Sequence, residues 1–333
     1  MTLPIAITIG DPAGIGPELS LRVAADADFQ PDVPVLLIGS AEVLQRVAGA
    51  VGLNVSVCVV ADPSEAARKP GVAYVLDVPM DGVSTITPGQ VTAANGAAAV
   101  AAIERSAELA LASQILGTVS APANKEAFNA AGHHYEGQTE IYAALTNTTA
   151  FHTLLIGGPL RVSLVSAHCS MLEAIRRVRA DRVERIVGEM HEALRNGFGI
   201  ATPRIGVAGL NPHAGENGVF GREEIDELAP AIARLRNRGI DVSDPLASDS
   251  LFAAHEAGRY DAVLAMYHDQ GTIPLKRFGY VSYSAGLPIT RTTAGHGTAF
   301  DIAWKGIANP ELLSRATKIA VDLGTRRLAT ERA

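Results

Sequence analysis

Short apolar runs alternate with longer segments of helical periodicity along this 333-residue chain, and this alternation restricts its fold more than any other feature. The runs are rich in Val, Ile and Leu, which is typical of parallel strands joined by crossover helices. The predicted strands are residues 4–9, 34–39, 72–76, 115–120, 160–167, 204–210 and 261–266. The predicted helices are residues 16–25, 41–52, 91–113, 138–146, 180–196, 221–236 and 310–324. The pattern therefore predicts an α/β protein.

Length and composition limit the other possibilities. At 333 residues we expect two lobes, or one large α/β unit whose halves share a cleft. The formal net charge of -7, with Lys and Arg spread along the chain, indicates no nucleic-acid partner. The N-terminus is interpreted as a first strand rather than a signal peptide, and no uninterrupted apolar stretch predicts a membrane span. The two cysteines form no CxxC pair, so a cytoplasmic location is expected.

Three of the nine histidines, His168, His213 and His268, each lie just beyond one of the last three predicted strands. One histidine after a strand is usually a hydrogen-bonded structural residue, but three at equivalent positions favour a shared role. Loops at the carboxyl ends of parallel strands meet at one edge of the sheet, where ligands bind. Neutral imidazoles bind divalent transition metals, and three protein ligands leave positions open for water or substrate. The sequence therefore predicts a metal site held by these three side chains.

Acidic residues near these histidines are expected to orient a metal ligand or to act as a base. Asp269 directly follows His268, and Asp249 lies in the turn of residues 244–251. The alternative for Asp249 is that it caps the helix that begins there. Cys169, which has no paired base, is interpreted as an inert buried thiol.

The first strand runs into a glycine-rich turn, GDPAGIGPE, at residues 10–18. Such a turn lets the backbone approach a ligand and directs a helix N-terminus at an anion, although it is as often structural. Its spacing matches neither the dinucleotide-binding fingerprint nor the P-loop. Lys125 follows the predicted strand at residues 115–120, where it either orients an anionic group or begins a helix as an exposed residue.

Two later stretches could bind anions. In residues 136–140, EGQTE, the Thr139 hydroxyl and backbone N–H groups could hold an oxyanion at the start of a helix. Farther along the chain, Lys276 adds an ammonium group and Arg291 adds a bidentate guanidinium.

A glycine-flanked turn at residues 295–302, GHGTAFDI, could pack against an adenine or a phosphate. Asp301 could accept hydrogen bonds from ribose hydroxyls. The alternative is that the segment is simply the capped start of a helix.

Five sequence blocks together resemble the 4-hydroxythreonine-4-phosphate dehydrogenase family and span almost the whole chain in the family's order. The blocks are GDPAGIGPE at 10–18, EGQTE at 136–140, NPHAGENG at 211–218, YHDQG at 267–271 followed by Lys276, and GLPITRT with HGTAFDIA at 286–303. The segment HGTAFDIAWKGIANP is also similar to the adenosine-binding loop of isopropylmalate and isocitrate dehydrogenases, whose fold the family shares. The resemblance implies two α/β/α lobes with a cleft between them. It places a cofactor-binding lobe at residues 1–135 plus 286–333 and a metal-binding and dimerisation lobe at residues 136–285.

The resemblance also implies roles for single residues. It implies a homodimer whose metal site is completed across the subunit interface, with His268 supplied by the partner chain. Zinc is the expected cation, and Mg, Mn, Co and Ni are alternatives. The implied substrate-binding residues are Gln138, Thr139, Lys276, Ser282 and Arg291. The residues implied to face the adenosine of NAD are His296, Gly297, Thr298 and Asp301.

The reaction implied by the resemblance is oxidation of a secondary alcohol in a phosphorylated hydroxy acid by hydride transfer to NAD, followed by loss of CO2. A cation would stabilise the alkoxide and then the ketone that takes up the electrons of the departing carboxylate. The candidate catalytic residues are Asp249, Asp269 and Lys125.

The chain departs from the family pattern at positions that meet the substrate. Gln138 replaces a histidine, Ser282 replaces an asparagine, and the loop after Lys276 is one residue shorter; Trp304 replaces a small residue beside the adenosine loop. Two substrates therefore stay open: 4-phosphohydroxy-L-threonine, as in vitamin B6 (pyridoxine) biosynthesis, or the substrate of a catabolic paralogue. The latter would be D-threonate or D-erythronate 4-phosphate, or a cyclic diol acid. A non-catalytic metal- or ligand-binding protein is the third hypothesis, although such a protein has no need of an NAD loop.

Overall fold

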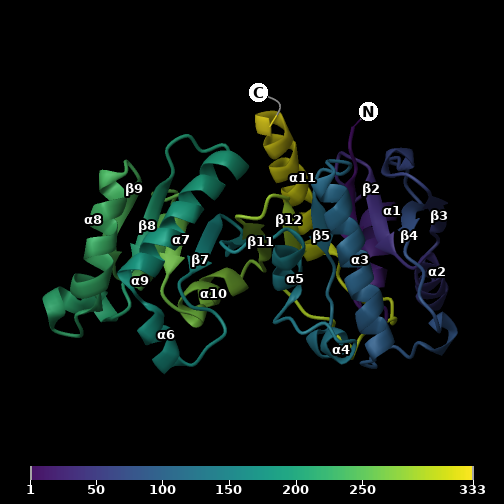
Figure 1. Ribbon diagram of the computed structural model, residues 1–333, viewed down its shortest axis with the longest axis horizontal. Helices are drawn as coiled ribbons and strands as arrows, with labels where there is room; N and C mark the ends of the chain where they lie inside the picture. Colours follow the sequence, from purple (N-terminus) through teal and green to yellow (C-terminus); the bar gives the residue numbers. More distant parts are fainter. Residues whose placement is uncertain (1, 332–333) are drawn as a thin grey trace. The chain divides into compact units, whose positions relative to one another are not determined.

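The computed structural model describes residues 2–331 of the chain, which form two compact units (Figure 1). The first unit comprises residues up to 150 together with residues from 287 onward, and the second unit comprises residues 151–286. The sequence-based boundary at residue 135 lies before helix α5 (Gln138–Leu145), which the structure assigns to the first unit. Helix α5 belongs there because the hydroxyl of its buried Tyr142 hydrogen-bonds to two residues of the first unit, Ser106 at 2.7 Å and Thr118 at 3.2 Å.

The first unit contains a sheet in which each strand pairs in parallel with its neighbours, as the apolar runs predict. Its strands, in spatial order, are β3 (Ser56–Val60), β4 (Val72–Asp77), β2 (Val35–Gly39), β1 (Ile5–Thr8), β5 (Thr118–Ser120) and β12 (Arg291–Ala294). Its other helices are α1 (Gly16–Ala25), α2 (Ala41–Ala50), α3 (Ala93–Leu111), α4 (Lys125–Ala130) and α11 (Glu311–Glu331). The helix α3 packs on β1, β2 and β5, while α1 and α11 pack on each other and on strands of the same sheet.

The second unit has a mixed sheet. Its strands, in spatial order, are β11 (Val281–Ala285), β6 (His152–Gly157), β7 (Leu160–Leu164), β10 (Ala262–Ala265), β8 (Arg204–Ala208) and β9 (Asp241–Leu246). The strand β6 runs antiparallel to both β11 and β7, whereas β7, β10, β8 and β9 are parallel. Its helices are α6 (Met171–Arg177), α7 (Ala180–Glu192), α8 (Ala229–Asn237), α9 (Ser248–Glu256) and α10 (His268–Lys276). One-turn π segments, Ala193–Gly197 and Glu224–Leu228, extend α7 and precede α8.

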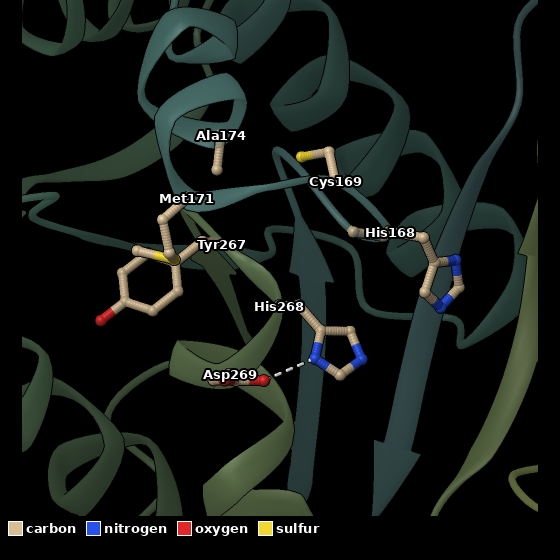
Figure 2. Close-up of a pocket in the computed structure, with 8 residues that line it drawn as sticks. His168, Cys169, Met171, Ala174, Tyr267, His268 and Asp269 are labelled. Carbon is tan, nitrogen blue, oxygen red and sulfur yellow. Dashed lines mark hydrogen bonds and ion pairs between the residues drawn. The ribbon is translucent and has the colours of Figure 1, made fainter.

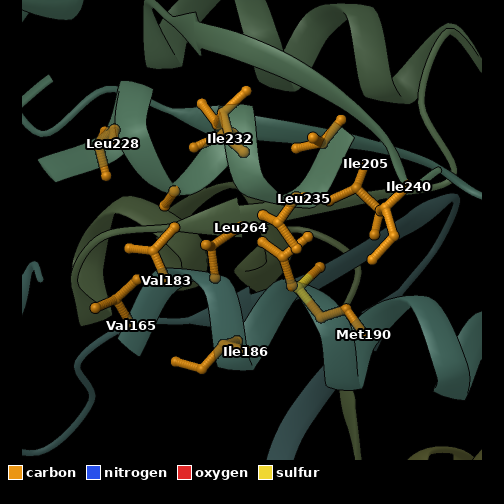
Figure 3. Close-up of a cluster of buried hydrophobic side chains, with 14 of the residues drawn as sticks. Val165, Val183, Ile186, Met190, Ile205, Leu228, Ile232, Leu235, Ile240 and Leu264 are labelled. Atoms are coloured by element: carbon orange, nitrogen blue, oxygen red, sulfur yellow. The ribbon is translucent and has the colours of Figure 1, made fainter. Parts of the chain in front are cut away.

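The central strand β10 shows why the second unit needs near-continuous apolar strands. Ala262 and Leu264 belong to the core under α7 and α8, shown in Figure 3. Val263 and Ala265 alternate with them and join separate clusters that include residues of α9 and α10. Since side chains alternate between the faces of a strand, both faces of β10 are buried.

The predicted strands and helices are all present, but the sequence pattern missed several elements. The missed strands are β3, β6, β9, β11 and β12, and the missed helices are α6 and α10. Helices α4 and α9 are outside the predicted ranges, but their starts agree with the alternatives given for Lys125 and Asp249. The strand β12 has the sequence RTTA, whose polar side chains hide a strand from a search for apolar runs. The helix α10 contains Pro274, which predicts a break rather than a helix. Among residues 2–331, no helix has the length and apolar character needed to cross a membrane.

Candidate active site

The three histidines follow neighbouring strands of the second unit. The strand β10 pairs in parallel with β7 on one side and with β8 on the other. His168 follows β7, His268 follows β10 and His213 follows β8, each within a few residues of the carboxyl end of its strand. The topology therefore places all three residues at the same edge of one sheet.

His168 and His268 lie next to each other in one chain, in the pocket shown in Figure 2. Their ring centroids are 5.6 Å apart. The Asp269 carboxylate lies 2.7 Å from Nδ1 of His268. A carboxylate accepts hydrogen bonds, so Nδ1 of His268 carries the proton and Nε2 keeps its lone pair for a metal. Asp269 therefore lies where it can orient the His268 ring, which is one of the two roles that the sequence suggested for it.

His213 lies on the 3-10 segment Pro212–Gly218, whose backbone is unusual. Residues 213–217 all have positive φ, including His213 at 53°, Ala214 at 54° and Glu216 at 42°. The His213 side chain is 72% exposed, and its Nδ1 lies 3.3 Å from Oε2 of Glu216. That contact also leaves Nε2 available.

The donor set fits a divalent transition metal, because it consists of imidazoles with available Nε2 atoms. Within residues 2–331 of a single chain, however, no three His, Cys, Asp or Glu side chains come together in a group able to hold an ion. His168 and His268 are adjacent and His213 stands apart from them. Cys169 lines the same pocket, where its thiol is half-buried rather than buried as the sequence suggested.

The catalytic candidates occupy different places. Asp249 is exposed in the first turn of α9 and accepts a hydrogen bond from the backbone N–H of Ser250 at 2.7 Å. The N-cap of this helix is Ala247, so Asp249 is not the capping residue. Lys125 is an exposed first residue of α4, and it belongs to the first unit.

A buried cationic site lies in the first unit, where Arg291 at the start of β12 is 2% exposed. Its guanidinium donates to Oγ of Ser120 at 3.1 Å and to Oγ1 of Thr139 at 2.9 Å. It also lies over the Tyr142 ring, 5.4 Å from the centroid. Burial lowers the pKa of Arg291 below its ordinary value. Ser120 and Tyr142 are contributors that the sequence did not single out.

Gln138 belongs to the same region, since its Nε2 donates to the carbonyl oxygen of Ala121 at 3.1 Å. Its Oε1 is buried and has no hydrogen-bond partner within residues 2–331. The structure thus brings Gln138, Thr139 and Arg291 into one unit. The other two predicted substrate residues lie in the second unit: Lys276 ends α10, near the Tyr280 ring, and Ser282 lies in β11.

The predicted adenosine loop packs on the glycine-rich turn that follows β1. The backbone N–H of Ile15 donates to the Thr298 carbonyl at 3.0 Å, and Nε1 of Trp304 donates to the Pro12 carbonyl at 3.0 Å. The turn is buried throughout, so it supports the loop rather than offering an open anion site. The segment after Gly297 forms turns, and α11 begins only at Glu311, so the alternative that residues 295–302 are the capped start of a helix is wrong.

The loop itself is accessible. A Cβ atom added at Gly297 would meet no atom within 4 Å, and Asp301 is exposed. His296 is half-buried, with its Nδ1 3.2 Å from the Gly297 carbonyl oxygen. Backbone and carboxylate groups of this loop are therefore open to a ligand.

Asp11, in the glycine-rich turn, is a buried carboxylic acid that the sequence did not mark. It is 0% exposed, and its Oδ2 has no hydrogen-bond partner within residues 2–331. Burial raises its pKa from 3.8 to about 6, even though the backbone N–H of Ala13 donates to Oδ1 at 2.9 Å. The folded protein therefore holds this proton more tightly than the unfolded chain does.

Replacing Asp11 by asparagine is expected to stabilise the protein at pH 8 and to leave its stability nearly unchanged at pH 4. A raised folded-state pKa means that wild-type stability falls as the pH rises from about 4 to about 6, by up to about 3 kcal/mol. The amide keeps an Oδ1 acceptor and carries no charge. Urea unfolding at the two pH values measures the difference, with the exposed Asp81→Asn variant as control. If Asp11→Asn is less stable than the wild type at both pH 4 and pH 8, the folded protein stabilises the ionised Asp11 carboxylate and the prediction is wrong.

Solved structures show the class of protein to which this fold belongs. The structure of 4-hydroxythreonine-4-phosphate dehydrogenase from Klebsiella pneumoniae is similar with a TM-score of 0.91 and 40% identity, covering 97% of this chain and 100% of the other. The fold is thus that of a dehydrogenase. Residues 32–320 match the family described as pyridoxal phosphate biosynthetic protein PdxA. The chain belongs to this family, as the sequence blocks predicted.

Relatives within the family carry two different names. A D-threonate 4-phosphate dehydrogenase from Pectobacterium atrosepticum is 40% identical over 327 residues, which are 97% of this chain and 100% of the relative. A 4-hydroxythreonine-4-phosphate dehydrogenase from Pseudomonas putida is 42% identical over 331 residues, covering 98% and 99% respectively. Identity alone therefore does not separate the two substrates.

Proposed function

We propose that this chain is a metal-dependent, NAD-linked dehydrogenase that oxidises and decarboxylates a phosphorylated hydroxy acid of the 4-phosphohydroxy-L-threonine type. The observation that carries the proposal is the set of three histidines at one sheet edge, with Asp269 orienting His268. A phosphorylated acid also needs a cationic group to bind it, and the buried guanidinium of Arg291 is such a group.

His168, His213 and His268 would hold the cation, with zinc preferred over Mg, Mn, Co or Ni because the ligands are imidazoles. The cation would stabilise negative charge on the substrate oxygen. Asp249 is the proposed base, because its carboxylate is exposed, whereas Asp269 is occupied by His268. Asp249 would take up the hydroxyl proton, and NAD, when bound, would supply the hydride acceptor. Loss of CO2 from the resulting β-keto acid would leave the electrons of the carbon–carboxylate bond on the substrate, where a proton must be added at carbon to complete the ketone product.

Arg291, Thr139 and Gln138 of the first unit would bind an anionic group of the substrate and fix its orientation. Lys276 of the second unit is also a proposed anion-binding residue. Lys125, exposed at the start of α4, would help to attract the anionic substrate. The Oε1 atom of Gln138 can only accept hydrogen bonds, so it favours a substrate that presents a hydroxyl or ammonium group there.

The ammonium group of 4-phosphohydroxy-L-threonine and a hydroxyl of the second candidate substrate, D-threonate or D-erythronate 4-phosphate, would both satisfy this acceptor, so both acids are candidates. A cyclic diol acid is the unphosphorylated alternative. Following NADH absorbance with each acid, with and without a chelator, tests the proposal. Chelator-sensitive turnover with one of these acids supports it, and the preferred acid identifies the substrate. No turnover with any of them would support a non-catalytic binding protein.

Asp301→Ala is expected to raise the KM for NAD about 10-fold while kcat changes little. The proposed role of Asp301, together with His296, Gly297 and Thr298, is to bind the adenosine, and a lost hydrogen bond from a ribose hydroxyl to a carboxylate costs about 1.5 kcal/mol. Steady-state kinetics with varied NAD measure the effect. The exposed Asp322→Asn change on α11 provides a control, and an unchanged KM for NAD would refute the assignment of Asp301.

The proposed active unit is a homodimer in which His268 of one subunit completes the metal site of the other. Exposed apolar side chains follow each histidine, which suits burial in a subunit interface. They are Met171, Leu172 and Ile175 after His168, Val219, Phe220 and Ile225 after His213, and Ile273 after His268. The two free cysteines, Cys58 and Cys169, suit a reducing cytoplasm.

Mixing inactive His168→Ala and His268→Ala subunits tests the shared site. If each site combines these residues from two chains, half of the dimers are mixed and have one intact site, so activity returns to about a quarter of wild type. If instead each site uses His168 and His268 of the same chain, whose rings are adjacent, every mixed dimer lacks an intact site. Mixing then restores no activity. Remixing His168→Ala subunits alone provides the baseline.

A further inference from the structure

The Gln270 side chain connects three separate segments of the second unit. It is the third residue of α10, two positions after His268. Its Oε1 accepts a hydrogen bond from the backbone N–H of Met266 at 2.6 Å. Its Nε2 donates to the carbonyl oxygen of Gly209 at 2.8 Å and to Oγ of Ser248 at 2.7 Å. Both N–H bonds of the amide and its oxygen are therefore used.

Each of these partners leads directly to a residue of the proposed site. Met266 precedes His268 at the end of β10, and Gly209 follows β8, four positions before His213. Ser248 begins α9 and precedes Asp249. One amide thus joins the two histidine-bearing loops and the helix that carries the proposed base.

The start of the His213 loop is held by a second contact, two residues after Gly209. The buried Glu224 accepts from the backbone N–H of Asn211 at 2.8 Å and from Nδ2 of the same residue at 2.9 Å. An added Cβ at Gly209 would lie 2.7 Å from Cα of Ala214, so the start of the loop packs tightly on its own middle. With Asn211 fixed by Glu224, the Gln270 contact at Gly209 sets where the loop leaves the sheet.

We infer that Gln270 is a positioning residue that couples the placement of His213, His268 and Asp249. The inference rests on the proposed metal site. A glutamine suits this role because it supplies an acceptor for one strand end and two donors for the other two segments. Partners that orient metal ligands are worth 10–100-fold in metal affinity or activity.

The test is zinc affinity, measured by competition with a chromophoric chelator. Gln270→Met keeps a side chain of similar length and removes all three hydrogen bonds, so the Kd for zinc is expected to rise by about 10–100-fold. Hydrogen exchange in residues 209–218 should become faster, and kcat should fall while the KM for NAD stays the same. Ser248→Ala removes one hydrogen bond and should shift the same quantities by a smaller amount. Gln45→Met, at an exposed position of α2, is the matched control.

The outcomes separate the inference from the proposed function. Wild-type zinc binding with an unchanged affinity in both Gln270→Met and Ser248→Ala overturns the role of Gln270 and leaves the metal site standing. Wild-type protein that binds no zinc, magnesium, manganese, cobalt or nickel overturns the proposed function and the inference with it. If Gln270→Met does not fold, the Ser248→Ala affinity and exchange measurements decide.

Discussion

His213→Ala is expected to remove the bound cation and to lower kcat/KM by about a thousandfold or more. A metal ion in such a site supplies several kcal/mol of transition-state stabilisation, and each 1.36 kcal/mol is a factor of ten in rate. The His213 side chain is 72% exposed, so its loss removes little packing. Metal content by atomic emission and NADH formation, measured on the same preparation, check the prediction.

Two further variants make the His213 result specific. His213→Asn retains a residue type that tolerates the left-handed backbone at φ 53° but replaces the imidazole, so it should be as inactive as the alanine variant. His134→Ala changes an exposed histidine of the first unit and should leave metal content and turnover unchanged. Full turnover in either His213 variant would refute the metal assignment.

Arg291→Met is expected to lower kcat/KM by about 100- to 1000-fold, chiefly through the KM for the acidic substrate. Losing a buried charged partner of an anion costs about 3–4 kcal/mol. The change in the free energy of unfolding should be smaller, about 2 kcal/mol or less. Relief from burying a charge offsets the loss of the hydrogen bonds to Ser120 and Thr139. Steady-state kinetics and urea unfolding measure the two effects.

The control for Arg291 is Arg105→Met on α3, where the side chain is 42% exposed and pairs with Glu108. A surface pair of this kind contributes about 0–1 kcal/mol, so neither activity nor stability should change appreciably. An unchanged KM for the acid in Arg291→Met would show that the anionic group binds elsewhere.

Much of the fold could be predicted because the central strands of both units are apolar on both faces. The runs that became β1, β2 and β10 are buried along their whole length, and local pattern alone identifies such strands. The strand β12 escaped prediction because Arg291 and its threonines form a polar strand that is stabilised by tertiary contacts. The strand β3 escaped because it lies at a sheet edge, where only Val60 is fully buried and Val59 is exposed, so burial imposes no clear pattern on its sequence.

The candidate site was predictable where a residue's role follows from its place after a strand. The positions of His168, His213 and His268 at one sheet edge follow from topology, and the Asp269 contact follows from adjacency to His268. Gln270 could not be found in this way, because its partners at Gly209 and Ser248 are distant in sequence. The burial of Asp11 likewise depends on loops contributed by other parts of the first unit.

The left-handed backbone of residues 213–217 has a consequence for how this protein can evolve. Each non-glycine residue in that region costs roughly 1–2 kcal/mol, and His213, Ala214, Glu216 and Asn217 all adopt it. The backbone conformation therefore limits which residue types the loop tolerates, whatever their side-chain chemistry. Tolerated substitutions are glycine, asparagine, aspartate and other small or polar residues. β-Branched residues are excluded, even though most of these side chains face solvent.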